Sequence, residues 1–340
     1  MPALRIDATL RHQGLLFSFL AGLVSLASHV LGRLDPRAEL LVLGLLILVL
    51  GVPHGALDLV LARRLYQLRS AKQRVAFVLA YLFLAALVVA LWIHSPGLFL
   101  AVFLLISAVH FSGDPAEGTP LLARVLYGGA IMVLPTAQHA SEVEGLLSLL
   151  VGNEPAMLLV GGLRPLAFAW LFGLVVAAAL RLRSDPTTGL ELLAVALLAT
   201  AAPPLLAFTV FFCLMHGVRH VLRTVAHGGA ARGVLLEGFG PMVAVLALAS
   251  SAWMLSDGVP LDARILRPLF VGLAALTVPH MLVVERIRLA GWAPPRFSKN
   301  ERTVRATTTS ALGNGRRGRL RAVKEPFPEN SISEENREPD

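Results

Sequence analysis

Residues 75–94 read VAFVLAYLFLAALVVALWIH, twenty residues without a single Asp, Glu, Lys or Arg. A bilayer core of about 30 Å is crossed by roughly 20 apolar residues in an α-helix, so this stretch predicts a transmembrane helix. The whole chain fits, because 56% of its 340 residues are hydrophobic, 15% are charged and the mean hydropathy is +0.70. Soluble domains carry about 25% charged residues, and disordered chains are rich in charge. The composition therefore predicts an integral membrane protein.

Other apolar stretches repeat this pattern along the chain. They predict an all-α fold class, a polytopic transmembrane helix bundle of about 8–10 spans. The uncertainty in the count comes from two short stretches, 97–112 and 189–203. The predicted spans are residues 15–34, 39–61, 75–94, 97–112, 121–138, 163–181, 189–203, 205–224, 240–256 and 266–288.

Near Pro294 the composition changes to charged, Ser, Thr, Asn and Gly residues without apolar periodicity. Such a segment cannot bury enough apolar surface to order itself. We therefore predict two parts: a transmembrane helical domain at residues 1–293 and a polar, disordered cytoplasmic tail at residues 294–340. A basic run within residues 316–321 leaves contact with anionic lipid open. A solvated tail without its own function is the simpler interpretation.

Basic residues in short loops predict the orientation, because Lys and Arg concentrate on the cytoplasmic side of a membrane. Counting spans outward from the most basic loop places the N- and C-termini in the cytoplasm, with the chain in the cell's inner (plasma) membrane. The net charge of +8 is then a property of such loops, and no nucleic-acid partner is expected. That loop holds Arg63, Arg64, Arg69, Lys72 and Arg74.

Two scarce residue types exclude several classes of site. Cys213 is the only cysteine, which excludes a disulfide framework and any zinc or iron–sulfur site built from several thiolates. The three lysines, Lys72, Lys299 and Lys324, lie outside the apolar stretches. A retinal-binding rhodopsin is disfavoured, because it needs a buried lysine for its Schiff base.

Histidines are concentrated in the predicted spans, where ionisable groups are costly and usually face a functional interior. Eight of the ten histidines lie in these spans or at their ends. A single intramembrane histidine is more often a satisfied polar contact than a ligand. However, because successive spans alternate in direction, five of the histidines fall at one depth, in the cytoplasmic half of the bilayer. These are His54, His110, His216, His220 and His280. Together they predict one shared centre.

The sequence around these histidines adds carboxylates and helical spacing. His216 and His220 are four residues apart and so share a helix face, as in zinc-binding helices. Asp58 lies one turn from His54, after Pro53 and Gly55 have loosened the helix, and Asp114 follows His110. Such carboxylates ligate a metal or orient an imidazole.

Imidazole and carboxylate ligands suit iron, copper, zinc or nickel, and a site of this type with open positions suits non-haem Fe(II) and dioxygen. Zinc hydrolysis is weakly supported, because the chain has no His-Glu-x-x-His sequence. Bis-histidine haem fits the pair at His216 and His220 poorly, because both rings point from one side of one helix.

These segments, in this order and spacing, resemble the Brp/Blh family of bacterial and archaeal β-carotene 15,15′-dioxygenases over roughly residues 40–290. One difference is Ser112, which stands between His110-Phe111 and Gly113 where the family usually continues directly with Gly. The resembling segments are Gly51-Val52-Pro53-His54-Gly55-Ala56-Leu57-Asp58, His110-Phe111-Ser112-Gly113-Asp114, His216-Gly217-Val218-Arg219-His220 and Pro279-His280-Met281-Leu282-Val283.

The resemblance implies a membrane enzyme, with residues 1–293 as its catalytic domain, that uses O2 to cleave β-carotene at the central double bond. The products would be two molecules of all-trans-retinal, commonly destined for a microbial rhodopsin. The family pattern implies Fe(II) held by catalytic histidines at four positions. Three further residues belong to the site, and His139 is left outside the ligand set. The implied ligands are His54, His110, His216 and His220. The further site residues are His280, as a ligand or substrate contact, and Asp58 and Asp114, which would orient imidazoles or occasionally act as ligands.

Three other functions remain open from the residues alone. A membrane lipid oxygenase or desaturase would use similar ligands, although such enzymes usually carry three histidine boxes that this chain lacks. A b-type cytochrome would show a haem absorbance band. A transporter with a histidine proton relay would lose flux on histidine substitution without losing bound iron.

Overall fold

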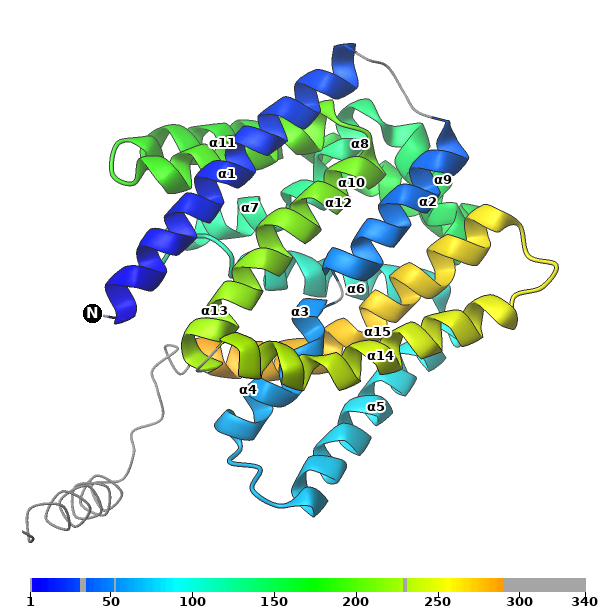
Figure 1. Cartoon of the computed structure of the whole chain (residues 1–340). Helices are drawn as coiled ribbons and strands as arrows, with labels where there is room; N and C mark the ends of the chain where they lie inside the picture. Colours follow the sequence, from blue (N-terminus) through cyan, green and yellow to red (C-terminus); the bar gives the residue numbers. More distant parts are fainter. Residues whose placement is uncertain (1, 31–34, 52, 229–230, 290–340) are drawn as a thin grey trace, which may run out of the picture. The chain divides into compact units, whose positions relative to one another are not determined.

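In the computed structural model, every regular element among the described residues is helical (Figure 1). The described residues are 2–30, 35–51, 53–228 and 231–289, and they belong to one compact unit, Met1–Ala293. The predicted tail at residues 294–340 lies outside them. The helices are α1 (Pro2–Val30), α2 (Pro36–Leu46), η1 (Ile47–Gly51), α3 (Pro53–Ala56), α4 (Asp58–Leu65), α5 (Ala71–His94), α6 (Pro96–Phe111), α7 (Leu121–Val133), α8 (Pro135–Gln138), α9 (Ala140–Val151), α10 (Asn153–Leu182), α11 (Pro186–Ala201), α12 (Pro204–Val210), η2 (Phe211–Gly217), α13 (Val218–Gly228), α14 (Ala231–Met254) and α15 (Leu261–Leu289).

Seven stretches of the described chain are long and apolar enough to cross a membrane, and α6 and α11 are shorter apolar helices. α5 shows how the surface is built: none of its residues is buried, and Leu79 and Phe83 are more than half exposed. Apolar surface of this extent is not stable in water. The chain is therefore a multi-pass membrane protein of the all-α class, as predicted.

The predicted span at residues 39–61 is not one continuous helix. α2 passes into a π-helical turn, η1, and the chain restarts as the short helices α3 and α4. Pro53 begins α3; proline lacks the amide hydrogen that would continue a helix, and its ring clashes with the preceding turn. Within a membrane such breaks persist only where protein surrounds them, and here Gly51 packs closely against Phe212.

A second π-helical turn, η2, interrupts the predicted span at residues 205–224 and lies beside η1. The Cys213 thiol of η2 donates a hydrogen bond of 3.6 Å to the carbonyl of Leu46, at the junction of α2 and η1. π-Helical turns are rare and occur mainly at functional sites. The first break precedes His54, and the second contains His216.

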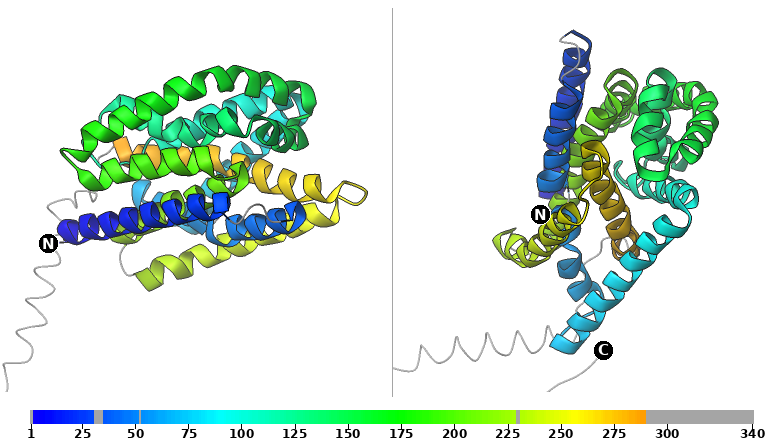
Figure 2. Two further views of the ribbon diagram at one scale, coloured as in Figure 1. Left: turned by 90° about the horizontal axis from the view of Figure 1, so that it is seen from above. Right: turned by 90° about the vertical axis from the view of Figure 1, so that its right-hand side faces the viewer.

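The remaining helices pack around these two broken segments. α11 contacts α1 on one side and α10 on the other, and the green helices α10 and α11 lie side by side (Figure 2). α5 packs along α15, and α6 packs on α7. α9, which the spans predicted above omit, contacts α10 and α15. The C-terminal ends of α6 and η2 and the later part of α15 thereby meet inside the bundle.

Candidate metal centre

Three buried histidines meet where α6, η2 and α15 converge. His110 is in the last turn of α6, His216 is in η2, and His280 follows Pro279 within α15. One ligand atom from each lies within 4.8 Å of the other two, and all three side chains are 3–6% exposed. The His110 ring lies 4.6 Å from the His216 ring and 5.0 Å from the His280 ring, measured between centroids. Three imidazoles at this separation can surround one metal ion.

A second group shares His280 with the first. Asp58, at the start of α4, and His220, one turn beyond η2, each offer a ligand atom within 4.8 Å of one on His280. The rings of His220 and His280 have centroids 4.9 Å apart. The structure therefore brings together four of the five histidines that the sequence places at one depth. We call these four, His110, His216, His220 and His280, the histidine cluster.

Each of two cluster histidines is held by a buried carboxylate. Asp58 Oδ1 lies 2.7 Å from His280 Nδ1, and Asp114 Oδ2 lies 3.0 Å from His216 Nδ1. A carboxylate at Nδ1 fixes the ring orientation and the tautomer, and it raises the basicity of the other nitrogen. Nε2 is then the atom with which His216 and His280 would ligate a metal.

Tyr81 extends the contact on the His280 side. Its hydroxyl donates a hydrogen bond of 2.7 Å to Asp58 Oδ2, while Oδ1 of the same carboxylate faces His280. Tyr81 lies in α5, the apolar helix with which the sequence analysis begins, and that analysis did not select it. A single tyrosine in an apolar run carries little signal, because its aromatic ring fits a lipid-facing helix without any partner.

Two arginines fix the backbone that carries Asp114. Arg219 Nη1 donates to the Asp114 carbonyl at 3.0 Å, and Arg223 donates to the same carbonyl at 2.9 Å and to that of Gly113 at 3.1 Å. Asp114 follows the end of α6, so these bonds hold the turn that aims its carboxylate at His216. The position of Asp114 therefore depends on two arginines that act through backbone carbonyls.

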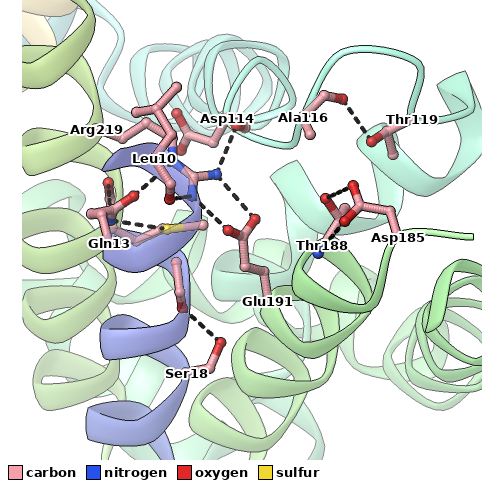
Figure 3. A network of polar contacts seen from close by, with 12 residues as sticks. Leu10, Gln13, Ser18, Asp114, Ala116, Thr119, Asp185, Thr188, Glu191 and Arg219 are labelled. Carbon is pink, nitrogen blue, oxygen red and sulfur yellow. Dashed lines mark hydrogen bonds and ion pairs between the residues drawn. The ribbon is translucent and has the colours of Figure 1, made fainter. Parts of the chain in front are cut away.

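Arg219 is itself held by a buried ion pair. Its guanidinium donates to both carboxylate oxygens of Glu191 in α11, at 2.6 and 3.0 Å, and to Gln13 Oε1 in α1 at 2.9 Å (Figure 3). Both charged side chains are 3% exposed. The sequence offered one signal that was not used: Glu191 is a carboxylate inside the short predicted span 189–203, where an unpaired charge would be costly.

Two histidines need separate mention. His54 lies in α3, but its side chain is outside the described part of the structure, so its predicted role as a ligand stays a prediction. His139 belongs to neither group of potential ligands; its nearest charged partner is Glu142, 3.8 Å away and one turn along.

A large apolar cavity opens onto the histidine cluster. Its empty volume is about 1300 Å³, including the part open to its surroundings. His110, His216 and His280 line it, and most of the remaining lining is aliphatic and aromatic. The other lining residues are Gly55, Leu100, Phe103, Leu104, Ser107, Phe111, Ile131, Met132, Pro135, Val143, Leu146, Leu147, Leu150, Leu163, Pro204, Leu205, Phe208, Phe212, Leu266, Phe270, Leu273, Leu276 and Thr277.

Comparison with known proteins gives one family. The family model described as β-carotene 15,15′-dioxygenase matches residues 45–288, which include the whole histidine cluster. A β-carotene 15,15′-dioxygenase from an uncultured marine bacterium, 66A03, is 30% identical over 263 residues, covering 71% of this chain and 91% of that protein. A protein of Halobacterium salinarum named as a probable β-carotene 15,15′-dioxygenase, Blh, is 26% identical over 328 residues, covering 82% and 93%. No solved structure matches this chain.

Proposed function

This chain belongs to the β-carotene 15,15′-dioxygenase family, and on that premise we propose that it cleaves β-carotene at its central double bond with O2 to give two molecules of all-trans-retinal. The observation that carries the proposal is the meeting of two features, a buried cluster of imidazoles and a large apolar cavity that opens onto it. A C40 hydrocarbon needs the second feature, and its oxidation needs the first.

The donor set fits Fe(II). Imidazole nitrogen with carboxylate oxygen, and open positions for O2, is the ligand type of non-haem iron oxygenases, and no described thiolate competes, because Cys213 is the only cysteine. We propose that His110, His216, His220 and His280 hold the iron, with His54 as a further ligand. When bound, Fe(II) supplies the activation of O2 that organic side chains cannot provide.

The remaining site residues orient and enclose. Asp58 and Asp114 accept from Nδ1 of His280 and His216 and so present Nε2 of each ring to the iron. The apolar lining holds the polyene and excludes water from the reacting double bond, which protects reactive species from side reactions. Because the substrate is insoluble in water, it reaches the cavity from the bilayer.

The setting of this activity follows from the membrane fold. We propose that the protein resides in the inner (plasma) membrane with its termini in the cytoplasm, because the most basic loop, around Arg69, follows α4. A microbial rhodopsin is the proposed acceptor of the retinal, since that apoprotein consumes this aldehyde.

Pigment analysis of cells that accumulate β-carotene tests the function directly. Expression of the full chain is expected to convert carotene to retinal, and His216→Ala is expected to abolish this while the protein remains in the membrane. The His139→Ala variant serves as the control, since His139 lies outside both groups of ligands. Carotene that persists despite folded, iron-loaded protein would remove β-carotene as the substrate.

A further inference from the structure

The histidines lie at one end of the cavity. On α6 the lining runs from Leu100 to His110 and Phe111, and on α15 it runs from Leu266 to His280. On the chain through α12 and η2, His216 is likewise the last lining residue. Three elements thus each present a histidine at the C-terminal end of the stretch that faces the cavity.

The distance from the histidines to the other end follows from helix geometry. Leu100 precedes His110 by ten residues, and Leu266 precedes His280 by fourteen. At a rise of 1.5 Å per residue these separations are about 15 and 21 Å. The cavity therefore extends from the cluster in one main direction over roughly that length.

Polarity changes along the same direction. Ser107 and Thr277 are the hydroxyl-bearing residues of the lining, and each stands three residues before a cluster histidine. Beyond them toward the other end the lining is aliphatic, aromatic and proline side chains. Polar groups gather where dioxygen chemistry would occur, and the distant part suits hydrocarbon.

Buried leucines from three helices line the distant end. Leu100, Leu150 and Leu266 line the cavity and are exposed by 1%, 7% and 1%. Two hydrogen bonds fasten this wall: Trp92 Nε1 donates to the Leu150 carbonyl at 2.9 Å, and Arg267 Nε donates to the Leu149 carbonyl at 2.8 Å. We call Leu100, Leu150 and Leu266 the end wall.

One half of β-carotene matches this depth, and the whole molecule does not. An extended chain advances about 1.2 Å per bond, so the roughly nine bonds from the central carbon to the ring, together with the ring, span about 14 Å. A second half of equal length would not fit between the histidines and the end wall.

We infer that the end wall determines the position of cleavage. One ring rests against Leu100, Leu150 and Leu266, and the central double bond then lies at the histidine cluster. This inference rests on the proposed function. A ring seated short of the wall would leave a void and lose its packing contacts, and a ring cannot pass the wall. The cut therefore falls at the centre because of depth, in a substrate whose double bonds are chemically similar along the chain.

Variants that change the depth test the inference with β-carotene as the only substrate. Leu150→Trp shortens the cavity, so the ring-bearing fragment from the seated half is expected to lose about two carbons, one double-bond repeat of ~2.4 Å. The complementary aldehyde gains the same number. The double variant Leu150→Ala/Leu266→Ala deepens the cavity and is expected to move the cut away from the seated ring. Because β-carotene is symmetric, this gives the same pair of unequal fragments as Leu150→Trp, so the expected result for both variants is unequal fragments in place of retinal. Chromatography with mass spectrometry reads the lengths of both fragments.

Leu98→Trp is the matched control, because Leu98 stands near Leu100 on α6 but is 57% exposed and does not line the cavity. It is expected to yield retinal alone, as the wild-type chain does. A wild-type chain that makes no retinal removes the proposed function itself. The end wall does not set the cut if the wild-type chain makes retinal and neither depth variant changes the fragment lengths. The same conclusion holds if Leu150→Trp is inactive and the alanine pair gives only retinal.

Discussion

Asp58 Oδ1 lies 2.7 Å from His280 Nδ1, although 222 residues separate the two in the chain. The contact joins the start of α4, just after the broken helical segment, to the middle of α15. The contact depends on the break: a continuous helix through residues 39–61 would carry Asp58 along the helix axis, whereas the restart at α3 and α4 sets it against His280.

Asp58→Asn is expected to lower metal affinity or activity by about 10- to 100-fold, the usual cost of removing a partner that orients a ligating imidazole. The amide keeps the shape but loses the charge of the acceptor that holds the His280 ring. Iron content per folded protein, measured after purification, is the direct readout. Unchanged iron content and unchanged retinal formation would show that the contact only packs the bundle.

Tyr81→Phe is expected to have a smaller effect than Asp58→Asn. It removes one hydrogen bond to a charged group, worth about 1.5–3 kcal/mol, but it leaves the contact between Asp58 and His280 in place. Iron affinity should fall by less than in Asp58→Asn, and the double variant should add little, because both changes act through the same carboxylate. Additive losses would place Tyr81 outside this chain of contacts.

His280→Ala is expected to abolish retinal formation and to reduce bound iron, as His216→Ala does, because His280 belongs to both groups of potential ligands. The sequence analysis placed His280 outside the four implied ligands, whereas in the structure it belongs to both groups of potential ligands. This variant tests whether His280 holds the iron. Full iron loading with lost activity would make His280 a substrate contact.

Glu191→Gln is expected to destabilise the protein strongly, because it leaves the Arg219 guanidinium buried opposite a neutral amide. Breaking a buried pair on one side costs about 3–5 kcal/mol, whereas replacing both partners with apolar groups is often neutral. Thermal unfolding in detergent should therefore show a larger loss for Glu191→Gln than for Glu191→Leu/Arg219→Met. The double variant still loses the bond to the Asp114 carbonyl, so its retinal formation should remain impaired while its stability recovers.

Asp185, which caps the N-terminus of α11, gives the fold a pH dependence. Partial burial raises the pKa of Asp185, but hydrogen bonds from the Thr188 hydroxyl and amide outweigh burial and lower the pKa below its ordinary value. The positive charges of Arg181 and Arg11 act in the same direction. A carboxyl whose pKa is lower in the folded state stabilises the fold above its unfolded pKa, about 3.9, and this contribution is lost as pH falls through the folded pKa.

The unfolding temperature of the wild-type chain should accordingly exceed that of Asp185→Asn at pH 7, and the gap should close as the pH falls below about 4. Thr188→Val removes the hydroxyl that donates to the Asp185 carboxylate, so it should bring the pKa of Asp185 in the folded protein closer to its ordinary value. When Asp185→Asn is made in the Thr188→Val protein, the gap in unfolding temperature should therefore close at a higher pH. A gap that is constant from pH 7 to pH 3 would assign the effect to packing.

Much of the fold was predictable because the bilayer restricts the possibilities to long apolar helices. The run at residues 75–94 lies within α5, which begins four residues earlier, at Ala71, and ends at the same residue, His94. The break inside residues 39–61 was not predicted: Pro53 and Gly55 signalled local loosening, but whether a helix bends or restarts depends on packing partners such as Phe212. α9 was missed because its twelve residues are too short to register as a span.

The grouping of the histidines was predictable, and the contacts that hold each of them were not. Histidines in apolar runs stand out because they are costly there, and counting spans grouped them by depth. Which carboxylate holds which ring depends on tertiary contacts that no local pattern encodes. Asp58 was paired with its neighbour in sequence, His54, whereas the described contact is with His280. The part played by Arg219 was hidden because it acts through a backbone carbonyl.

The π-helical turn η2 makes the site sensitive to the number of residues in the chain as well as to their identity. A π turn accommodates one residue more per turn than an α-helix does. If the same seven residues, Phe211–Gly217, closed as an ordinary α-helix, the chain on one side of them would rotate by about 100° relative to the other; losing one residue at the same time would leave the two sides in register. The cavity-lining Phe208 precedes this turn, and His216 lies near its end. The extra residue held by the π turn therefore keeps the His216 imidazole facing the cavity, which an α-helix of the same residues would not do although every side chain would be unchanged.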